Sequence, residues 1–455
     1  MISRRQLIAA ACATVATVAV APRAFASPLA RIASGDMRGA IDAVAYSAPA
    51  NSDAQSRKLQ AMINTAARDN APVMLPPGTY RVSNLALPDN TRLIGVAGAT
   101  RIVYGGDGHL MKAENAKRIQ ISDIVIDGAN RWLAEDAGAL MQFAGVDEVL
   151  IDNCEVVGSA KNALQLERCG GRIARSHLSG AADAGIYAVQ STGLTIADNR
   201  VEDCGNGGIL VHRWQKGEDG TVISGNRIAR IGARDGGTGE NGNGINVFRA
   251  GNVMVTNNHI ADCAFTAVRA NSASDVQISN NQCLRSGETA IFCEFEFEGA
   301  VVSGNLIDGA SNGIAIANFD KGGRLASVTA NVVRNLSLAA PYAQDGGFGI
   351  GISAEADTLI ASNVIENAPL WGIKLGWGPY MRNLVATGNI VRHATVGCAV
   401  SVADGAGSAV ISDNLFEASV NGAIVAFLWD KPASKDLAGG STAYPQLTID
   451  RNRLA

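Results

Sequence analysis

The chain has 455 residues and a formal net charge of −4, and 47% of its residues are hydrophobic. This hydrophobic fraction excludes a disordered chain, and only 12 prolines without a Gly-X-Y period exclude collagen. Neither the charge balance nor any long Lys/Arg run indicates a nucleic-acid-binding protein, which normally carries a basic face. Eight cysteines in a chain of this length are too few for a disulfide scaffold.

The first 26 residues predict an export signal. Arg4 and Arg5 precede an uncharged stretch at 7–20 that is too short to cross a membrane as a helix, and Ala-Phe-Ala at 24–26 is a small-x-small cleavage pattern. Paired arginines are typical of the twin-arginine (Tat) route, and the alternative is an ordinary secretory signal. We therefore expect a periplasmic or secreted protein whose export partner is the Tat translocase. No run of about 18 apolar residues follows, so the mature protein is predicted to lack a transmembrane segment.

Residues 27–118 are predicted to form an N-terminal cap and the first coils of a repeat. Ser52 and Gln55 make a capping box at the start of a helix. Apolar residues then follow helical spacing on one face: Leu59, Met62, Ile63 and Ala66. The segments 73–82 and 91–103 are strand-like, with glycine and proline at the breaks.

Residues 119–455 are dominated by a short repeat whose first half is an apolar strand that ends in asparagine. Most copies lie 22–32 residues apart, and Ile124, Cys154 and Ser176 hold the asparagine position in the first three copies. The other ten copies carry asparagine: Asn199, Asn226, Asn258, Asn281, Asn305, Asn331, Asn363, Asn389, Asn414 and Asn452. Asparagine suits a fixed turn because it tolerates the left-handed conformation, and stacked asparagines can bond from rung to rung.

The second half of the repeat is a small residue followed by an apolar-x-apolar strand, as in Gly208-Ile209-Leu210-Val211. A unit of this size cannot bury its apolar face alone, but it can do so when stacked on its neighbours. Alternating side chains suit a coil that is lined inside by Ile, Val and Ala. The repeat therefore predicts an all-β solenoid of about 12–13 rungs.

The chain resembles known β-helix proteins in two features. The predicted helix followed by Pro-Pro-Gly-Thr-Tyr-Arg-Val at 76–82, together with the asparagine turns, resembles the right-handed parallel β-helix of pectin-lyase-like proteins. With the paired-arginine leader, the chain is similar to the bacterial TAT-translocated repetitive protein family over about residues 40–454. The resemblance implies a right-handed parallel β-helix with an N-terminal capping helix. It names no reaction, because the GHG and RIK motifs of polygalacturonases and the D-P-H segment of alginate epimerases are missing.

Outward-facing positions on the second strand of the repeat carry the candidate site. Since Ile and Val point inward, the residues between them point outward. Over four adjacent rungs these positions and their continuations collect polar and aromatic side chains: His212, Trp214, Asn246, Phe248, Arg269, Asn271, Phe292, Glu294 and Glu296. Polar groups and flat aromatic rings on one face are what a sugar-binding groove needs. The same outward column continues several rungs further to Lys374.

Two long inserts point to the same face. The spacings from Asn226 to Asn258 and from Asn331 to Asn363 are both 32 residues, and both inserts contain Asp-Gly-Gly. The inserts should leave one corner of the coil four rungs, or about 19 Å, apart, as walls of a groove. The alternative is a pair of solvated loops on an inert rod.

Three of the collected residues are the predicted catalytic groups. Arg269 and Glu294 lie on neighbouring rungs, where Arg269 would stabilise a carboxylate or an anionic intermediate, and Glu294 or His212 would move a proton. A surface ion pair is the alternative. In the segment 292–298 we expect acidic side chains outward and aromatic ones inward, with Glu294 and Glu296 about 7 Å apart along the strand. That spacing fits an inverting glycosidase but also fits any solvated strand edge.

No metal or cofactor site is predicted. The five histidines are scattered. Calcium-type oxygens occur in a single copy at Asp235, Glu240, Asn241 and Asn243, which makes calcium the weaker alternative. Cys204 and Cys263 share a repeat position but lie two rungs apart, beyond disulfide reach.

Two classes of function remain from the sequence. One is an exported enzyme, a lyase or hydrolase, that acts on a polysaccharide or oligosaccharide in the groove. The other is a non-catalytic glycan-binding protein or structural rod of the cell envelope. Convergence of Arg269, Glu294 and His212 in a cleft would favour the enzyme, whereas a flat face with these side chains splayed apart would favour the rod.

Overall fold

The computed structural model describes residues 41–42, 52–440 and 442–455. The segment Gly39–Ala455 forms one compact unit, to which all the described residues belong. The predicted export signal at 1–26 lies outside the described residues. No helix in the described ranges is long and apolar enough to span a bilayer.

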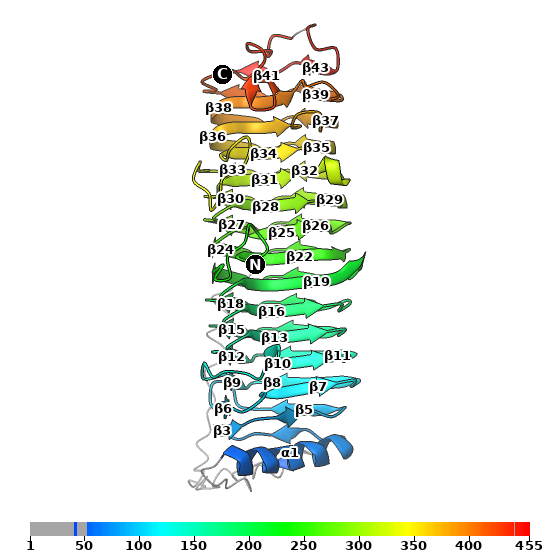
Figure 1. Cartoon of the computed structure of the whole chain (residues 1–455), viewed down its shortest axis with the longest axis vertical. Coiled ribbons are helices and arrows are strands. Elements are labelled where there is room, and N and C mark those ends of the chain that lie inside the picture. The colour runs from blue at the N-terminus through cyan, green and yellow to red at the C-terminus, as the bar shows by residue number, and fades with distance from the viewer. Residues whose placement is uncertain (1–40, 43–51, 441) are drawn as a thin grey trace, which may run out of the picture. The chain divides into compact units, whose positions relative to one another are not determined.

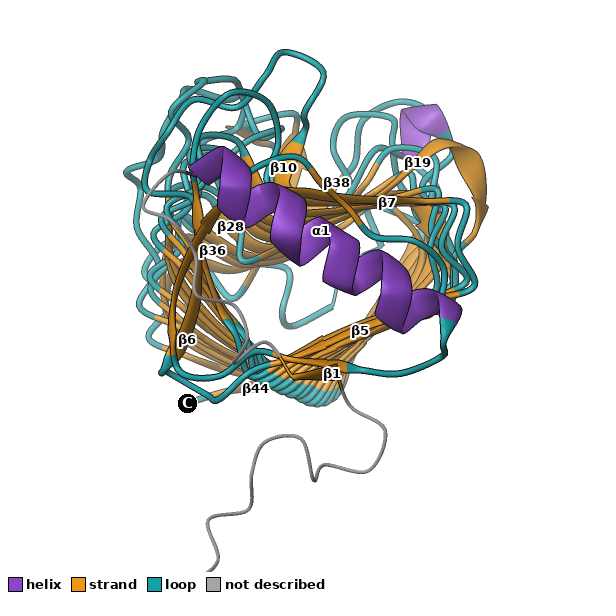
Figure 2. Cartoon of the chain, turned by 90° about the horizontal axis from the view of Figure 1, so that it is seen from below, coloured by secondary structure: helices purple, strands orange, loops and turns teal. Residues whose placement is uncertain are grey.

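Helix α1 (Ser52–Arg68) covers the N-terminal end of the coil, as Figure 2 shows. Leu59 and Ile63 face the coil with no exposed surface, as the helical spacing predicts. Gln60 exchanges two hydrogen bonds with the backbone of Ala86, of 2.7 and 2.8 Å, and the hydroxyl of Ser56 accepts the N–H of Ser83 at 2.9 Å. Side chains of the helix therefore form hydrogen bonds with backbone groups that the end of the coil would otherwise leave unpaired.

The remaining chain winds into a parallel β-helix of about 14 turns, in which each strand pairs with its equivalent in the next turn (Figure 1). We distinguish three columns of strands. The first column is a 16-stranded sheet: β1 (Ile41–Asp42), β2 (Val73–Met74), β5 (Thr91–Ile94), β8 (Arg118–Ser122), β11 (Glu148–Asp152), β14 (Gly171–Ala174), β17 (Thr195–Ala197), β20 (Val222–Ser224), β23 (Met254–Thr256), β26 (Val276–Ser279), β29 (Glu298–Ser303), β32 (Arg324–Thr329), β35 (Ala356–Ala361), β37 (Arg382–Thr387), β39 (Ala409–Ser412) and β43 (Leu447–Asp450).

The second column follows the asparagine turns: β3 (Gly78–Val82), β6 (Thr100–Tyr104), β9 (Val125–Asp127), β12 (Glu155–Val157), β15 (His177–Ser179), β18 (Arg200–Glu202), β21 (Arg227–Ile231), β24 (His259–Cys263), β27 (Gln282–Leu284), β30 (Leu306–Asp308), β33 (Val332–Arg334), β40 (Leu415–Glu417) and β44 (Arg453–Leu454). The long strands β36 (Val364–Leu375) and β38 (Ile390–Ser401) belong to both the second and the third column.

The third column carries the Gly-Ile phrase and the candidate site: β4 (Leu85–Ala86), β7 (Met111–Glu114), β10 (Ala139–Ala144), β13 (Asn162–Glu167), β16 (Ala184–Val189), β19 (Gly207–Glu218), β22 (Asn243–Gly251), β25 (Val268–Asn271), β28 (Thr289–Glu294), β31 (Asn312–Ile316), β34 (Ile350–Ala354), β41 (Ile424–Leu428) and β42 (Lys431–Pro432). The strand β42 runs antiparallel to β41, and a 3-10 turn lies at Phe319–Lys321.

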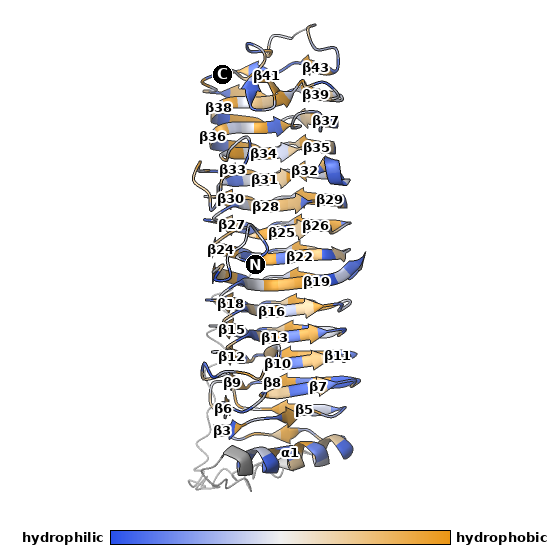
Figure 3. Ribbon diagram, in the orientation of Figure 1, coloured by the Kyte–Doolittle hydropathy of each residue, from blue (hydrophilic) through white to orange (hydrophobic). Residues whose placement is uncertain are grey.

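The core is one continuous hydrophobic cluster inside the coil. Ile186, Ile209 and Ile245 stack in register on successive strands of the third column, and none has exposed surface. Figure 3 shows hydrophobic residues in the strands at every level of the stack. The all-β fold with a capping helix is therefore confirmed. The predicted 12–13 rungs were slightly too few, because the first coils lack the asparagine phrase by which rungs can be counted in the sequence.

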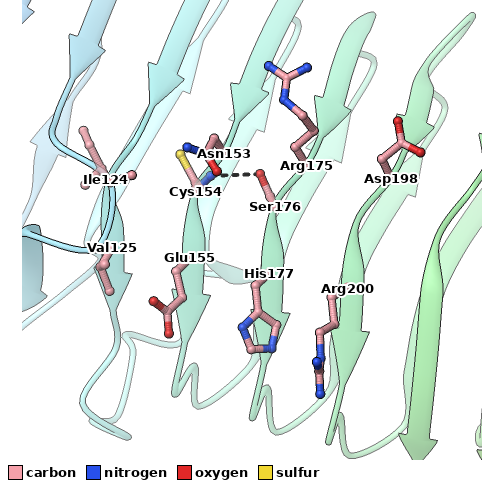
Figure 4. A pocket seen from close by; sticks show the side chains of 12 residues that line it. Ile124, Val125, Asn153, Cys154, Glu155, Arg175, Ser176, His177, Asp198 and Arg200 are labelled. Carbon is pink, nitrogen blue, oxygen red and sulfur yellow. Dashed lines mark hydrogen bonds between the residues drawn. The ribbon is translucent and has the colours of Figure 1, made fainter.

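The asparagines form the predicted ladder. From Asn199 to Asn414, the backbone N–H and the side-chain amide of each ladder asparagine both donate to the side-chain oxygen of the next one, at 2.9–3.1 Å, and the last acceptor is Asn452. In the earlier copies Ser176 accepts the N–H of Cys154 at 3.1 Å, and Figure 4 shows both residues in register with Ile124. One detail of the prediction was wrong: the left-handed residue precedes the ladder asparagine, as at Asn280 with φ 56°. Hydrogen bonding therefore accounts for asparagine in the ladder, and tolerance of positive φ does not.

Candidate functional site

The third column brings the predicted site residues into two outward rows. One row is Leu210, Asn246, Arg269 and Phe292, and the other is His212, Phe248, Asn271 and Glu294, each residue paired with the next across neighbouring strands. The register that the sequence predicts over β19, β22, β25 and β28 is therefore confirmed.

Five of the nine predicted residues line one pocket of about 350 Å³, which we call the first pocket. Its floor comes from strands β19, β22 and β25, one side from the insert 232–242, and another from the turn after β28. The lining residues are His212, Thr238, Gly239, Glu240, Asn246, Phe248, Arg269, Asn271 and Phe295.

The first insert (residues 232–242) is fastened to the coil so that it covers Arg269. Asn206 binds Asp235 through two hydrogen bonds of 2.7 and 3.0 Å, and the buried amide of Asn243 donates to the carbonyl of Gly239 at 2.8 Å. Gly239, at φ 135°, lies so close to Arg269 that a Cβ atom would come within 1.7 Å of Nη1. Only glycine fits this approach.

Arg269 is the centre of a buried ion network. Its Nε donates to Oε1 of Glu294 at 2.6 Å, and Nη1 lies 3.4 Å from Oε2 of Glu288. The exposed fractions of the Arg269, Glu288 and Glu294 side chains are only 10%, 1% and 4%, so a surface ion pair is excluded. Asn271 donates to the same oxygen of Glu294 at 2.8 Å, and the hydroxyls of Thr266 and Tyr342 donate to Glu288.

Tyr342 shows that the second insert (residues 335–349) differs from the expected distant wall. Its attachment point lies four rungs from that of the first insert, as predicted, but its chain folds back over the floor. The Tyr342 ring stacks on Phe265 at a centroid distance of 6.3 Å, and the backbone N–H of Phe265 donates to the carbonyl of Gly242, in the first insert, at 3.0 Å. The two inserts therefore meet around Phe265 and enclose the ion network.

Burial sets the protonation behaviour of the network. It raises the pKa of Glu294, against the opposing effect of Arg269. For Arg269 burial lowers the pKa, but Glu294 and Glu288 outweigh it and the net pKa is raised. Two carboxylates thus already pair with the one guanidinium, so the anion-stabilising role that the sequence predicts would require Arg269 to leave these partners.

His212 and Asn246 present polar atoms without partners. The Nε2 atom of His212 and the Oδ1 atom of Asn246 are buried and have no hydrogen-bond partner among the described residues. The His212 ring lies edge-on to Tyr187 and Phe248, with centroids 5.4 and 5.5 Å away. Burial lowers the pKa of His212 to about 4, so the imidazole is neutral at pH 7. A base of that pKa is weak at neutral pH, and the ring is better suited to hydrogen bonding than to proton abstraction.

Four predicted residues lie outside the first pocket. Glu294 lies behind Arg269 and Asn271, to which its carboxylate is bonded, and Phe292 packs under Arg269 with the guanidinium 5.2 Å from its ring centroid. Trp214 is 54% exposed in the second half of β19, the strand that projects beyond its neighbours in Figure 1. Glu296 is exposed, and its backbone carbonyl accepts a hydrogen bond from the ammonium of Lys216.

The predicted alternation over 292–298 was wrong. Strand β28 ends at Glu294 because Phe295 adopts a left-handed conformation with φ 60°. This turn places Glu296 outside the strand, so the separation of 7 Å from Glu294, calculated for a continuous strand, does not apply. After Glu294, Phe297 points into the core as predicted, but Phe295 points outward and lines the first pocket. Phe292 is outward, in agreement with its place in the outward row.

Several residues of the site escaped the sequence analysis. Thr238, Gly239 and Phe295 line the pocket from loops, and Glu240 was considered only as a calcium ligand. Glu288 and Tyr342 lie 54 residues apart and meet only in the folded chain. The repeat offers no signal for them, since loop residues do not follow its alternation.

The described part of the chain contains neither a cluster of metal-ligating side chains nor a disulfide. There, no group of three or more His, Cys, Asp or Glu is arranged to hold a metal ion. The seven described cysteines are all buried and free, and burial raises the pKa of Cys154 to about 12. These thiols therefore behave as small apolar side chains.

Comparison with known proteins identifies the fold family. The family model described as "right handed beta helix region" matches residues 95–228 and 169–332, which together make up more than half of the chain. The chain belongs to the right-handed β-helix family. No curated protein matches it in sequence.

Two solved structures share the right-handed β-helix at low identity. The pre-mature gene product 12 of bacteriophage phi29 has a TM-score of 0.50 and 16% identity over 87% of this chain, which spans only 58% of that protein. The Dettilon tailspike protein has a TM-score of 0.50 and 15% identity, with 83% of this chain and 69% of that chain covered. These likenesses show the fold alone.

Proposed function

We propose that this right-handed β-helix binds a polysaccharide on the outer face of its third column, with one sugar residue in the first pocket. The observation that carries the proposal is the pair of buried polar atoms, Asn246 Oδ1 and His212 Nε2, without partners at a pocket of about 350 Å³. A buried polar atom without a hydrogen bond costs about 1–3 kcal/mol. Sugar hydroxyls both donate and accept, so a bound sugar offsets this cost at both atoms.

The remaining lining suits the same ligand. Phe248 and Phe295 offer apolar surfaces against which the C–H groups of a sugar ring can pack. Asn271 and Glu240 add planar polar groups at the edge, which orient hydroxyls. Asn271 is itself held by Glu294, so the buried ion network positions a binding residue before the ligand arrives.

A glycoside hydrolase is the second candidate. The observation in its favour is that two carboxylates near the pocket have opposite shifts: hydrogen bonds from its own backbone and from Thr238 lower the pKa of Glu240, whereas burial raises that of Glu294. Glycosidases use such a pair as base and acid. Because Glu294 does not line the pocket, the binding function is the better supported one.

We also propose that the protein is exported through the Tat translocase to the periplasm or the medium. The paired arginines at 4–5, the uncharged stretch at 7–20 and the Ala-Phe-Ala pattern support this proposal.

The test of binding is a glycan array with the full chain, followed by calorimetry on each ligand found. Asn246→Leu keeps a similar volume but removes the amide, and we expect at least tenfold weaker binding, about 1.4 kcal/mol. Gln165→Leu is the matched control, since Gln165 occupies the same outward row three rungs away and does not line the pocket. Equal affinity of both variants and the parent would reject the site. Release of new reducing ends that Glu240→Gln abolishes would establish the hydrolase.

A further inference from the structure

A second pocket of about 200 Å³ lies on the same face of the coil, toward the C-terminal end. Strands β28, β31, β34 and β36 form its floor, and the second insert contributes Gln344 and Asp345 to its side. The residues that give it chemical character are Phe292, Asn318, Asp345, Glu355, Lys374 and Trp377.

Lys374 presents an ammonium group that lacks an acceptor. Its Nζ lies 4.2 Å from the ring centroid of Trp377 and 5.8 Å from that of Trp371. It forms no hydrogen bond or ion pair within the described part of the chain. Burial lowers its pKa to about 8, with Glu355 as the opposing influence. The aromatic rings stabilise the charge from the side, but an ammonium has three donors that rings do not satisfy.

Glu355 is the complementary group of this pocket. Its Oε2 accepts the N–H of Phe319 at 2.7 Å, and burial raises the pKa of its carboxyl. Glu355 and Lys374 both line the pocket, yet they form no ion pair within 4.0 Å. The Glu355 carboxylate, an acceptor, and the Lys374 ammonium, a donor, therefore line the same pocket without bonding to each other.

This arrangement selects an uncharged ligand. An anion that approached Lys374 would be repelled by Glu355 and Asp345, and a cation that approached Glu355 would be repelled by Lys374. A sugar hydroxyl can accept from the ammonium and donate to the carboxylate at once. Phe292 and Trp377 provide apolar walls for the ring of such a sugar. The first pocket also favours an uncharged ligand, because Arg269 already pairs with the two carboxylates of Glu288 and Glu294 and offers no free positive charge to an anion.

The two pockets adjoin along one row of the third column. Register pairs link Arg269 to Phe292, Ala315, Ser353 and Lys374 in turn, a span of four rungs or about 19 Å. Phe292 lines the second pocket while it packs against Arg269, which lines the first.

We propose that the second pocket is a second sugar subsite, so that an uncharged polysaccharide lies along the coil axis and fills both pockets. This inference rests on the proposed binding function. Two linked subsites raise the affinity for a ligand long enough to occupy both, since the second contact becomes intramolecular. A short oligosaccharide gains nothing from the second subsite.

The test measures binding of oligosaccharide series by calorimetry with the full chain. The probes are cello-, laminari-, malto- and manno-oligosaccharides from dimers to octamers, with oligogalacturonates as acidic counterparts. We expect the affinity for one uncharged series to rise at least tenfold with length and to exceed that for oligogalacturonates. Lys374→Met and Trp377→Ala should remove the gain for long members at least tenfold and leave short members unaffected, whereas Asn246→Leu should weaken both.

The outcomes separate the inference from the function on which it rests. If Asn246→Leu weakens binding but both second-pocket variants bind long members like the parent, the second subsite is wrong and the first pocket stands. Tighter binding of oligogalacturonates than of every uncharged series rejects the uncharged ligand. If no series binds, or if Asn246→Leu has no effect, the proposed function falls as well. Thermal melting of each variant confirms that the fold is retained, which we expect for Lys374→Met because it replaces a half-buried, unpaired charge by an apolar side chain of similar length.

Discussion

Removal of one ladder asparagine tests how much the stack contributes to stability. The Asn281 side chain makes four hydrogen bonds, all of 3.0 Å: it accepts the backbone N–H and the amide of Asn258, and it donates to the carbonyl of Val255 and to Asn305. Only 1% of Asn281 is exposed, so water does not replace these bonds. At about 0.5–1.5 kcal/mol each, Asn281→Ala should reduce the free energy of unfolding by about 2–6 kcal/mol.

The assay is guanidinium unfolding followed by circular dichroism, with hydrogen exchange as a local measure. Because a solenoid is stabilised by contacts between neighbouring coils, we expect exchange to quicken chiefly in the coils that contain Asn258 and Asn305. Asn421→Ala is the matched control, since Asn421 is exposed in a turn and its side chain makes no hydrogen bond with any described residue. If the midpoints of the two variants coincide, the ladder does not stabilise the coil and the hydrogen-bond argument is refuted.

Three further predictions concern the site and the leader. Arg269→Ala should destabilise the fold by about 3–5 kcal/mol in urea unfolding, because Glu288 and Glu294 lose their buried counter-ion. Arg200→Ala is the control: Arg200 is exposed and its partner Glu202 keeps Arg230 and His177, so this variant should unfold at nearly the same urea concentration as the parent. Equal losses in the two variants would contradict the network. His212 has a folded-state pKa of about 4, below its unfolded value near 6.5, so the unfolded chain takes up its proton first and stability is lost as pH falls from about 6.5 to 4. The unfolding free energies of the parent and of His212→Phe should therefore diverge by about 3 kcal/mol over this range. Parallel pH profiles of the two proteins would contradict the buried neutral imidazole. Changing Arg4 and Arg5 together to Lys should leave precursor in the cytoplasm, as cell fractionation would show, and normal export of the double variant would reject the Tat route.

The sequence predicted the architecture because the same pattern of turn and strand residues recurs in many copies. Asparagine at one turn and Gly-Ile on a later strand recur often enough to fix which residues of successive coils are equivalent and which side chains point outward on that strand. The rows that contain Asn246, Arg269 and Asn271 follow from this alternation alone, since a residue and its equivalent in the next coil must lie side by side. The lengths of the inserts also identified the corner at which they leave the coil.

What covers these rows was decided by the tertiary structure. Alternation states that Arg269 points outward, but not that Gly239 and Tyr342 close over it, because an insert has no period from which its path follows. Burial under these loops turns an apparent surface ion pair into a network with two carboxylates. The positive φ of Phe295 likewise ends β28 and separates Glu296 from Glu294. The sequence gives no sign of this turn, because positive φ is uncommon for a non-glycine residue and the apolar-polar alternation continues through Phe295. The repeat thus determined which residues share a face, while the pocket and the charges within it were set by contacts between distant segments that only the folded chain brings together.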